Sequence, residues 1–270
     1  MTGQVPGQRS LVLRLAGPLQ SWGGNSQFNR RDTLGEPTKS GITGLLAAAQ
    51  GRRRQDPIED LLALRLGVRT DQPGSLLRDY HTVSDYRGRP LLSAALSGKG
   101  TQKPTSPAKH THVTQRFYLQ DAVFVVAVSG PVEVLAVLNE AIRRPAFPLA
   151  LGRRACVPTQ PLLLDPHADE SGEHPGLWEG GPLAVLEHVP WQAPVMRPGV
   201  RGQRTPPPVV DLAVTVDDPT GDDVRPDLPR SFDPQSRAFT TRRVRQCWVR
   251  VATPFSGAID DHDPFALLGW

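Results

Sequence analysis

The stretch Thr114–Gly130, "TQRFYLQDAVFVVAVSG", predicts a β-strand whose second half is strongly apolar. The helix pattern that follows it, "PVEVLAVLNEAIRRP", lies between Pro131 and Pro145 and has apolar residues on one face. The apolar positions are Val134, Leu135, Leu138, Ala141 and Ile142. We therefore expect a core strand followed directly by a helix that packs on it.

The segments before this strand extend the same pattern. Leu11–Gly17, "LVLRLAG", alternates as a strand does, and "PTKSGITGLLAAAQGRRR" at 37–54 predicts a helix. Thr38 or Ser40 can cap the start of this helix, and Gly51 stands where helices commonly end. A short helix in "PIEDLLAL" and a strand in "RLGVRTD" come next.

A hairpin excursion is predicted between these elements and the core strand. "LLRDYHTV" at 76–83 is typical of one hairpin arm, and the polar segment from Ser84 to Thr111 leaves the core. With a loop and strand in "PLALGRRACVPTQPLLL", the order becomes strand, helix, strand, excursion, strand, helix, strand. This order predicts an α+β, ferredoxin-like (RRM-like) βαββαβ fold, with helices on one face of an antiparallel sheet.

Proline and glycine increase from about Asp165 onward, and the strand candidates become short. We expect two regions: 1–164 as a ferredoxin-like domain with a thumb insertion at about 84–113, and 165–270 as a smaller β-rich part. The strand candidates of the second region are "AVLEHVPW", "VVDLAVTV" and "QCWVRVATPF".

Composition and charge restrict the class of the protein and the cellular compartment expected for it. The 270 residues carry a net charge of +4, and only four of the 31 cationic residues are lysines. Two cysteines give no disulfide framework or metal motif, which favours a reducing cytoplasm. The sequence shows neither a signal peptide nor an apolar run approaching the ~20 residues of a membrane helix. We expect a soluble, cytoplasmic protein that needs no metal or cofactor.

The stretch at 37–54 is not a P-loop, because Thr33 and Thr38 occupy the positions where that motif needs glycine. What remains is a helix N-terminus with Thr38, Lys39 and Ser40, whose amide hydrogens and lysine could bind phosphate. The alternative is a capped helix with an exposed lysine.

A second cationic candidate is "LGRRAC" at 151–156. Gly152 allows a backbone to approach closely, and Arg153 and Arg154 would then point at whatever approaches. A plain turn with two exposed arginines is the alternative.

Residues suited to metal-free RNA cleavage stand near the excursion. Tyr80, His81, Lys109 and His110 could provide the base, the acid and the cation that such a reaction needs. The alternative is that they are polar positions on two hairpin arms. His110 and His112 lack a third ligand at zinc spacing.

Several blocks, in order from Leu11 to Phe232, resemble the CasD family of the type I-E CRISPR Cascade complex, in the RAMP superfamily. The blocks are "LVLRLAGPLQSWG", "PTKSGITGLLAAAQGRRR", "LRDYHTV", "TQRFYLQDAVFVVAV", "LGRRAC" and "LPRSF". The resemblance implies a non-catalytic, RNA-binding subunit with a thumb, which caps the 5′ handle of the guide RNA (crRNA) in antiviral defence. It also implies the CasC backbone subunit and the CasA large subunit as protein partners, and target DNA through the complex.

The resemblance also suggests roles for particular residues. Arg116 matches an arginine at the thumb base that grips the handle, and Gly152, Arg153 and Arg154 match the loop beside it. Ala150 departs from relatives that carry an aromatic there, so a stacking contact at this place is either absent or supplied by Phe147. A groove for single-stranded RNA needs cations and stacking platforms. Candidate cations are Arg30, Arg31, Lys39, Arg116, Arg153 and Arg154, and candidate platforms are Trp22, Phe28 and Phe117.

Two other functions remain open at this point. A type I-C relative cuts RNA, so the chain could be a metal-independent endoribonuclease that processes CRISPR repeat RNA. It could also be a protein-only assembly module whose arginines meet acidic partners.

Overall fold

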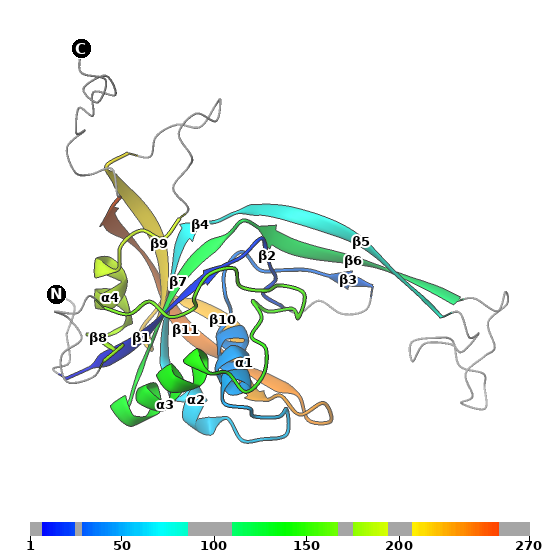
Figure 1. The fold of residues 1–270 in the computed structure, drawn as a ribbon, viewed down its shortest axis with the longest axis horizontal. Coiled ribbons are helices and arrows are strands. Elements are labelled where there is room, and N and C mark those ends of the chain that lie inside the picture. Colours follow the sequence, from blue (N-terminus) through cyan, green and yellow to red (C-terminus); the bar gives the residue numbers. More distant parts are fainter. Residues whose placement is uncertain (1–6, 25–28, 86–109, 167–174, 194–206, 254–270) are drawn as a thin grey trace, which may run out of the picture.

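The computed structural model describes residues 7–24, 29–85, 110–166, 175–193 and 207–253. Figure 1 shows a body built around one sheet, from which a long two-stranded hairpin projects. Within the described ranges, no helix is both long and apolar enough to cross a membrane.

The body contains a seven-stranded sheet in the order β10-β11-β9-β4-β7-β1-β8, and each neighbouring pair is antiparallel. The strands are β1 (Arg9–Ala16), β4 (Arg65–Gln72), β7 (Val123–Gly130), β8 (Trp178–Glu179), β9 (Val209–Asp217), β10 (Asp223–Ser231) and β11 (Ala238–Ala252).

β7 lies between β1 and β4 and is buried on both faces. Phe124, Val126 and Val128 belong to one core, which α1 (Lys39–Ala49) and α3 (Val132–Arg143) cover. Val125 and Ala127 belong to a second core, which α4 (Pro182–His188) covers from the other side. The expectation that helices cover only one face is therefore wrong, because α4 closes the second.

The helices begin and end where the sequence predicts. Thr38 caps α1 by accepting a hydrogen bond from Gly41 N at 3.1 Å, and Gly51 follows the helix with φ of +77°. Pro131 precedes α3, which buries its predicted apolar face, and the short helix α2 (Glu59–Leu62) leads into β4. Local capping chemistry thus sets these boundaries.

The α+β class is confirmed, but the last strand of the expected βαββαβ unit is short. Beside β1 it consists of a bridge between Leu13 and Leu163, with hydrogen bonds from Arg14 N to Leu162 O and from Leu164 N to Val12 O. β8 then pairs with the beginning of β1.

The strands of the region 165–270 continue this sheet and do not form a unit beside it. β9 pairs with β4 through the register Gly67↔Val216 to Arg69↔Val214, and β11 pairs with β9 along nine residues. The β-rich character predicted for this region is present in β9, β10 and β11. The strand predicted in "AVLEHVPW" at 184–191 is wrong, because residues 184–188 belong to the helix α4.

The projecting hairpin, which we call the arm, consists of β5 (Ser75–Asp85) and β6 (His110–Gln120). Their ladder runs from Ser75↔Gln120 to Asp85↔His110. The expected thumb boundaries of about 84–113 are therefore too narrow, since the paired strands begin at Ser75. Residues 86–109, which include Lys109, lie outside the described residues.

Two short strands flank the other side of β6 at the arm base. β2 (Leu19–Gln20) pairs antiparallel to β6, and β3 (Arg30–Arg31) pairs parallel to it. An isolated hairpin is only marginally stable in water, so these extra strands help to fix the direction of the arm.

A buried ion pair joins α4 to the sheet. Arg69 donates two hydrogen bonds to Asp71, at 2.7 and 2.9 Å, and both side chains are fully buried. Arg69 also donates to the carbonyls of Leu186 and Val189 at the end of α4, whose backbone acceptors have no helical partner. Asp71 in turn accepts a hydrogen bond from Gln192 N at 2.6 Å.

We predict that Arg69→Met lowers the free energy of unfolding by about 3–5 kcal/mol, because it leaves Asp71 buried without its cation. Urea denaturation measures this change. Arg250→Met, which breaks the exposed Arg250–Asp211 pair, is the matched control and should change stability little. Equal losses from the two substitutions would contradict the interpretation.

Candidate nucleic-acid interface

The arm base gathers arginines from separate segments. β3 pairs with β6 so that Arg31 stands beside Arg116, and the loop after α3 brings Arg153, which precedes Arg154 in the chain, to the same place. Side chains alternate between the two faces of a strand, so each register position is assigned to one face.

We call one side the arginine face. It contains the cross-strand pair Asp79↔Arg116, the pair His81↔Thr114 and the ring of Tyr118, with Arg31 beside Arg116. We call the opposite side the aromatic face. It contains Leu76, Arg78 and Tyr80 of β5, Gln115 and Phe117 of β6, and Arg30 of β3.

Gly152 is required where its loop meets Ser21, the residue that directly follows β2. Its φ is +88°, and a Cβ built there would lie 1.8 Å from the carbonyl oxygen of Ser21. Leu151 O accepts a hydrogen bond from Ser21 N at 3.1 Å. The prediction that a backbone approaches Gly152 is thus confirmed, but the approaching backbone is the chain's own.

Arg153 fixes the loop after α3 to the arm base through hydrogen bonds. Its guanidinium donates hydrogen bonds to Phe117 O at 3.1 Å and to Arg31 O at 2.7 Å. It also lies over the Tyr118 ring, 4.8 Å from the centroid. Arg153 therefore connects β3, β6 and the loop, and part of its hydrogen-bonding capacity is already used.

The neighbouring Arg154 differs, because it is exposed and has no hydrogen-bond or ion-pair partner among the described residues. Arg116 is half-buried, and its Nε donates only to Thr114 Oγ1 at 3.3 Å. These two side chains retain most of their donors for a ligand.

Arg30 lies on the other side of the arm from Arg31. It pairs with Asp32 at 2.9 Å and stacks on the Phe117 ring, with 4.7 Å between the guanidinium carbon and the ring centroid. The two adjacent arginines therefore cannot line one groove, although the sequence placed them together.

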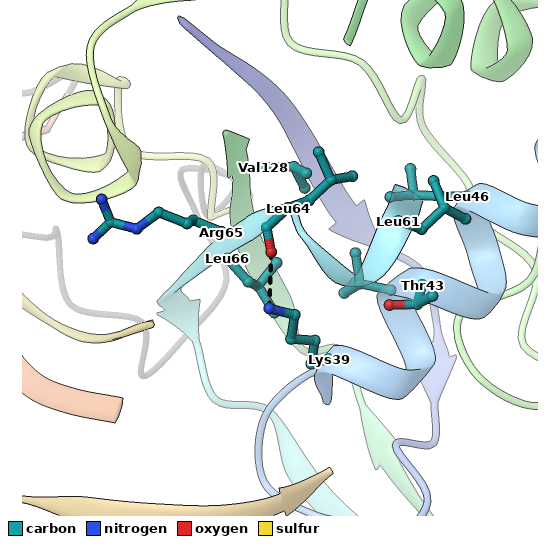
Figure 2. Close-up of a pocket in the computed structure, with 9 residues that line it drawn as sticks. Lys39, Thr43, Leu46, Leu61, Leu64, Arg65, Leu66 and Val128 are labelled. Carbon is teal, nitrogen blue, oxygen red and sulfur yellow. Dashed lines mark hydrogen bonds between the residues drawn. The ribbon is translucent and has the colours of Figure 1, made fainter. Parts of the chain in front are cut away.

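The expectation that Lys39 binds phosphate is wrong. Figure 2 shows its side chain pointing into the body, where the amine donates to Leu64 O at 2.8 Å. Nζ also pairs with Asp217 at 2.7 Å, and the residue is buried. The neighbouring pocket has a mostly aliphatic lining, so it is a poor receptor for an anion. Its lining includes Ile42, Leu46, Leu61, Leu64, Leu66 and Val128.

The other polar groups at the start of α1 also have partners within the protein. The backbone N–H of Lys39 donates to Asp227 Oδ2 at 2.8 Å, so a carboxylate of the protein already occupies the place of the predicted phosphate. Thr38 is buried as the cap, and its hydroxyl lies 3.2 Å from that of Ser40. Thr38, Lys39 and Ser40 therefore serve the fold, which the alternative of a capped helix partly anticipated.

Two of the candidate cleavage residues, Tyr80 and His81, have described side chains, and these do not converge. Tyr80 and His81 are consecutive in β5 and therefore point to opposite faces of the arm. His81 Nδ1 lies 3.5 Å from Asp79 Oδ2 on the arginine face. His110 pairs in backbone register with Asp85.

Cys156, two residues beyond Arg154, is a free and buried cysteine. Burial raises the pKa of the Cys156 thiol, although Arg153 partly opposes this shift. Over the described ranges, no group of three or more histidine, cysteine or acidic residues is arranged to hold a metal ion.

The comparison with protein families decides the kinship of the chain. The profile of the family described as CRISPR-associated protein (Cas_Cas5) matches residues 10–245. The chain belongs to the Cas5 family. It is 36% identical over 173 residues to the CRISPR system Cascade subunit CasD of Escherichia coli (strain K12), across 57% of this chain and 69% of that protein. The resemblance noted in the sequence blocks is confirmed.

Solved structures agree with this assignment. A chain of a CRISPR RNA-guided surveillance complex matches with a TM-score of 0.68 and 35% identity, covering 96% of this Cas5 chain and 98% of that chain. A second structure, described as a crystal structure of a Cas protein, matches with a TM-score of 0.61 and 34% identity. It covers 89% of this chain and 94% of that chain.

Arg78 is a candidate site residue of this Cas5 chain that its sequence pattern did not lead us to predict. It is exposed on the aromatic face and has no hydrogen-bond or ion-pair partner among the described residues. The alternation Leu76, Arg78, Tyr80 in "LLRDYHTV" was the available signal, since positions two apart share a face of a strand. Of the predicted platforms, Trp22 is buried, Phe147 is exposed, and Phe28 lies outside the described residues.

We predict that Gly152→Ala destabilises the protein by about 1–3 kcal/mol, because the added Cβ meets Ser21 O and the backbone is left-handed. Gly35→Ala is the matched control, since nothing lies within 4 Å of its Cβ position. Chemical denaturation of the two variants measures the difference. If they were equally stable, the close contact between this loop and Ser21 would be wrong.

Proposed function

We propose that this Cas5 protein is a CasD-type subunit of a CRISPR Cascade surveillance complex, and that its arm base holds the 5′ handle of the guide RNA. The kinship to CasD and to a chain of an RNA-guided surveillance complex supports the first part. The observation that supports the second is that Arg31 stands beside Arg116 on one face of the arm base, where Arg153 of the neighbouring loop donates to Arg31 O and is followed in the chain by the exposed Arg154.

The chemistry of the arginine face suits a phosphate backbone. Guanidinium groups bind phosphate oxygens with paired donors, and Arg154 and Arg116 have donors that the protein does not use. Arg153 adds positive charge while it fixes the loop. Asp79 is the opposing charge on this face, and it stands across the ladder from Arg116. The phosphates would therefore lie toward the loop and away from β5.

The remaining parts of the proposal concern the assembly. Target sequence would be read by pairing with the guide, so the protein needs contacts to backbone and shape more than to particular bases. The expected neighbours are the CasC backbone subunit and the CasA large subunit, with target DNA met through the complex. The expected location is the cytoplasm.

We predict that Arg154→Ala and Arg116→Ala each weaken the binding of guide RNA by the assembled complex about tenfold. A hydrogen bond to a charged group contributes about 1.5 kcal/mol or more. The logarithm of the affinity should also depend less steeply on salt, by about 0.7 in slope for each lost phosphate contact. Fluorescence anisotropy across a salt series measures both quantities.

Arg230→Ala removes an exposed arginine of β10, in the body, and is the matched control for this experiment. Unchanged affinity and slope in both arm-base variants would contradict the proposal. Binding with no salt dependence at all would favour the protein-only assembly module.

We also propose that this chain does not cut RNA, because Tyr80 and His81 lie on opposite faces of the arm. The pure protein, incubated with repeat RNA and EDTA, should bind the RNA and leave it intact on a denaturing gel. Specific cleavage that His81→Ala abolishes would instead establish the metal-independent endoribonuclease.

A further inference from the structure

The aromatic face of the arm carries large apolar side chains that the protein leaves uncovered. Leu76 is 66% exposed and Tyr80 is 68% exposed, although both belong to a well-paired ladder. Phe117 lies beside them under the stacked guanidinium of Arg30. Large apolar side chains that share one face of a strand are usually covered by other parts of the protein. An exposed row of this kind therefore indicates a binding surface.

The charge of this face indicates what the occupant is. Arg78 stands between Leu76 and Tyr80, is exposed and has no partner within the described residues. Asp79 points to the other side of the arm, and Asp32 is already paired with Arg30. Aromatic rings interleaved with arginines, and lacking an unpaired carboxylate, are typical of surfaces that hold unpaired nucleobases.

The spacing along β5 also fits nucleobases. Side chains two apart on a strand stand about 6.6 Å from each other, which is about twice the 3.4 Å spacing of bases along a nucleic-acid strand. One base therefore fits between neighbouring side chains of the row. An apolar protein surface would not use the free guanidinium of Arg78, whereas a base can stack on its plane.

We propose that the aromatic face is a stacking platform for unpaired bases of single-stranded RNA, with Tyr80 and Arg78 as its principal contacts and the Arg30–Phe117 pair as its inner end. This inference rests on the proposed function, because the guide RNA is the single strand expected at the arm. It adds that bases and phosphates meet different faces of the arm. It also predicts little preference among the four bases, since every base offers a stacking surface.

The test compares Tyr80→Ala with Tyr80→Phe in the complete complex, using guide RNA labelled at its 3′ end. Tyr80→Ala should weaken binding about tenfold to a hundredfold, the range expected for one stacked base. Tyr80→Phe keeps the ring and should bind as the native protein does. The salt slope should stay unchanged in both, because no phosphate contact is lost. Thr82→Ala, an exposed position on the same face, is the matched control.

A series of guides, each with one abasic nucleotide in the handle, identifies the partner of Tyr80. At one position, the abasic guide should bind native protein and Tyr80→Ala equally, because the stacking contact is then already missing. Equal loss with every abasic guide, or no loss with Tyr80→Ala, would overturn the inference. If Tyr80→Ala instead impaired assembly with the other protein subunits in the absence of RNA, the aromatic face would be a protein-docking surface. That result would also contradict the inference.

The same experiment separates this inference from the proposed function. If native protein binds the guide and Arg154→Ala weakens it, while Tyr80→Ala does not, only the stacking platform is wrong. If native protein and complex do not bind the guide at all, the proposed function fails.

Discussion

The structure depends on two carboxylates that join the beginning of α1 to the far side of the sheet. Asp217 pairs with Lys39 and with Arg242, and Asp227 pairs with Arg242 and accepts a hydrogen bond from Lys39 N. Asp217 Oδ2 also accepts from Leu66 N, at the start of β4. Burial alone would lower the pKa of Arg242, but its two carboxylate partners raise it. Two cations thus balance two anions, which makes such burial tolerable, and α1, β4, β9 and β11 are held in one arrangement.

From this anchored body, a chain of specific contacts extends to the arm. Trp22 is buried against Gly41 of α1, and Ser21 next to it contacts Gly152. Arg153 then connects the same loop to β3 and β6. The direction of the hairpin is therefore set by packing that begins in the core. A ligand bound at the arm base would meet a preorganised surface, and less binding energy would be lost in ordering it.

A feature of this structure could be predicted from the sequence when it depends on residues close together in the chain, and could not when it depends on distant residues. Caps and apolar periodicity predicted α1, α3 and the order of elements along the first part of the chain, because these depend on neighbouring residues. The apolar residues of β7 at both alternating positions were also a signal for a sheet covered on two faces, and it was overlooked. The burial of Lys39 could not be foreseen, because its partner Asp217 is 178 residues away. The opposite placement of Arg30 and Arg31 depends on β3, whose two residues are too few for a periodic signal.

The arginines of this protein can be ranked by how many of their five N–H donors the fold itself uses. Arg69 is fully buried and bound to Asp71 and to backbone carbonyls, so it is entirely structural. Arg153 is intermediate, because it bonds carbonyls and yet remains partly exposed. Arg154 and Arg78 have none of their donors engaged within the described residues. A sequence motif cannot make this distinction. In "GRR" at 152–154, one arginine fixes the loop and the next is free to contact a ligand, and nothing in the motif separates the two. The free donors, not the abundance of arginine, therefore define the surface on which the proposed RNA recognition should depend.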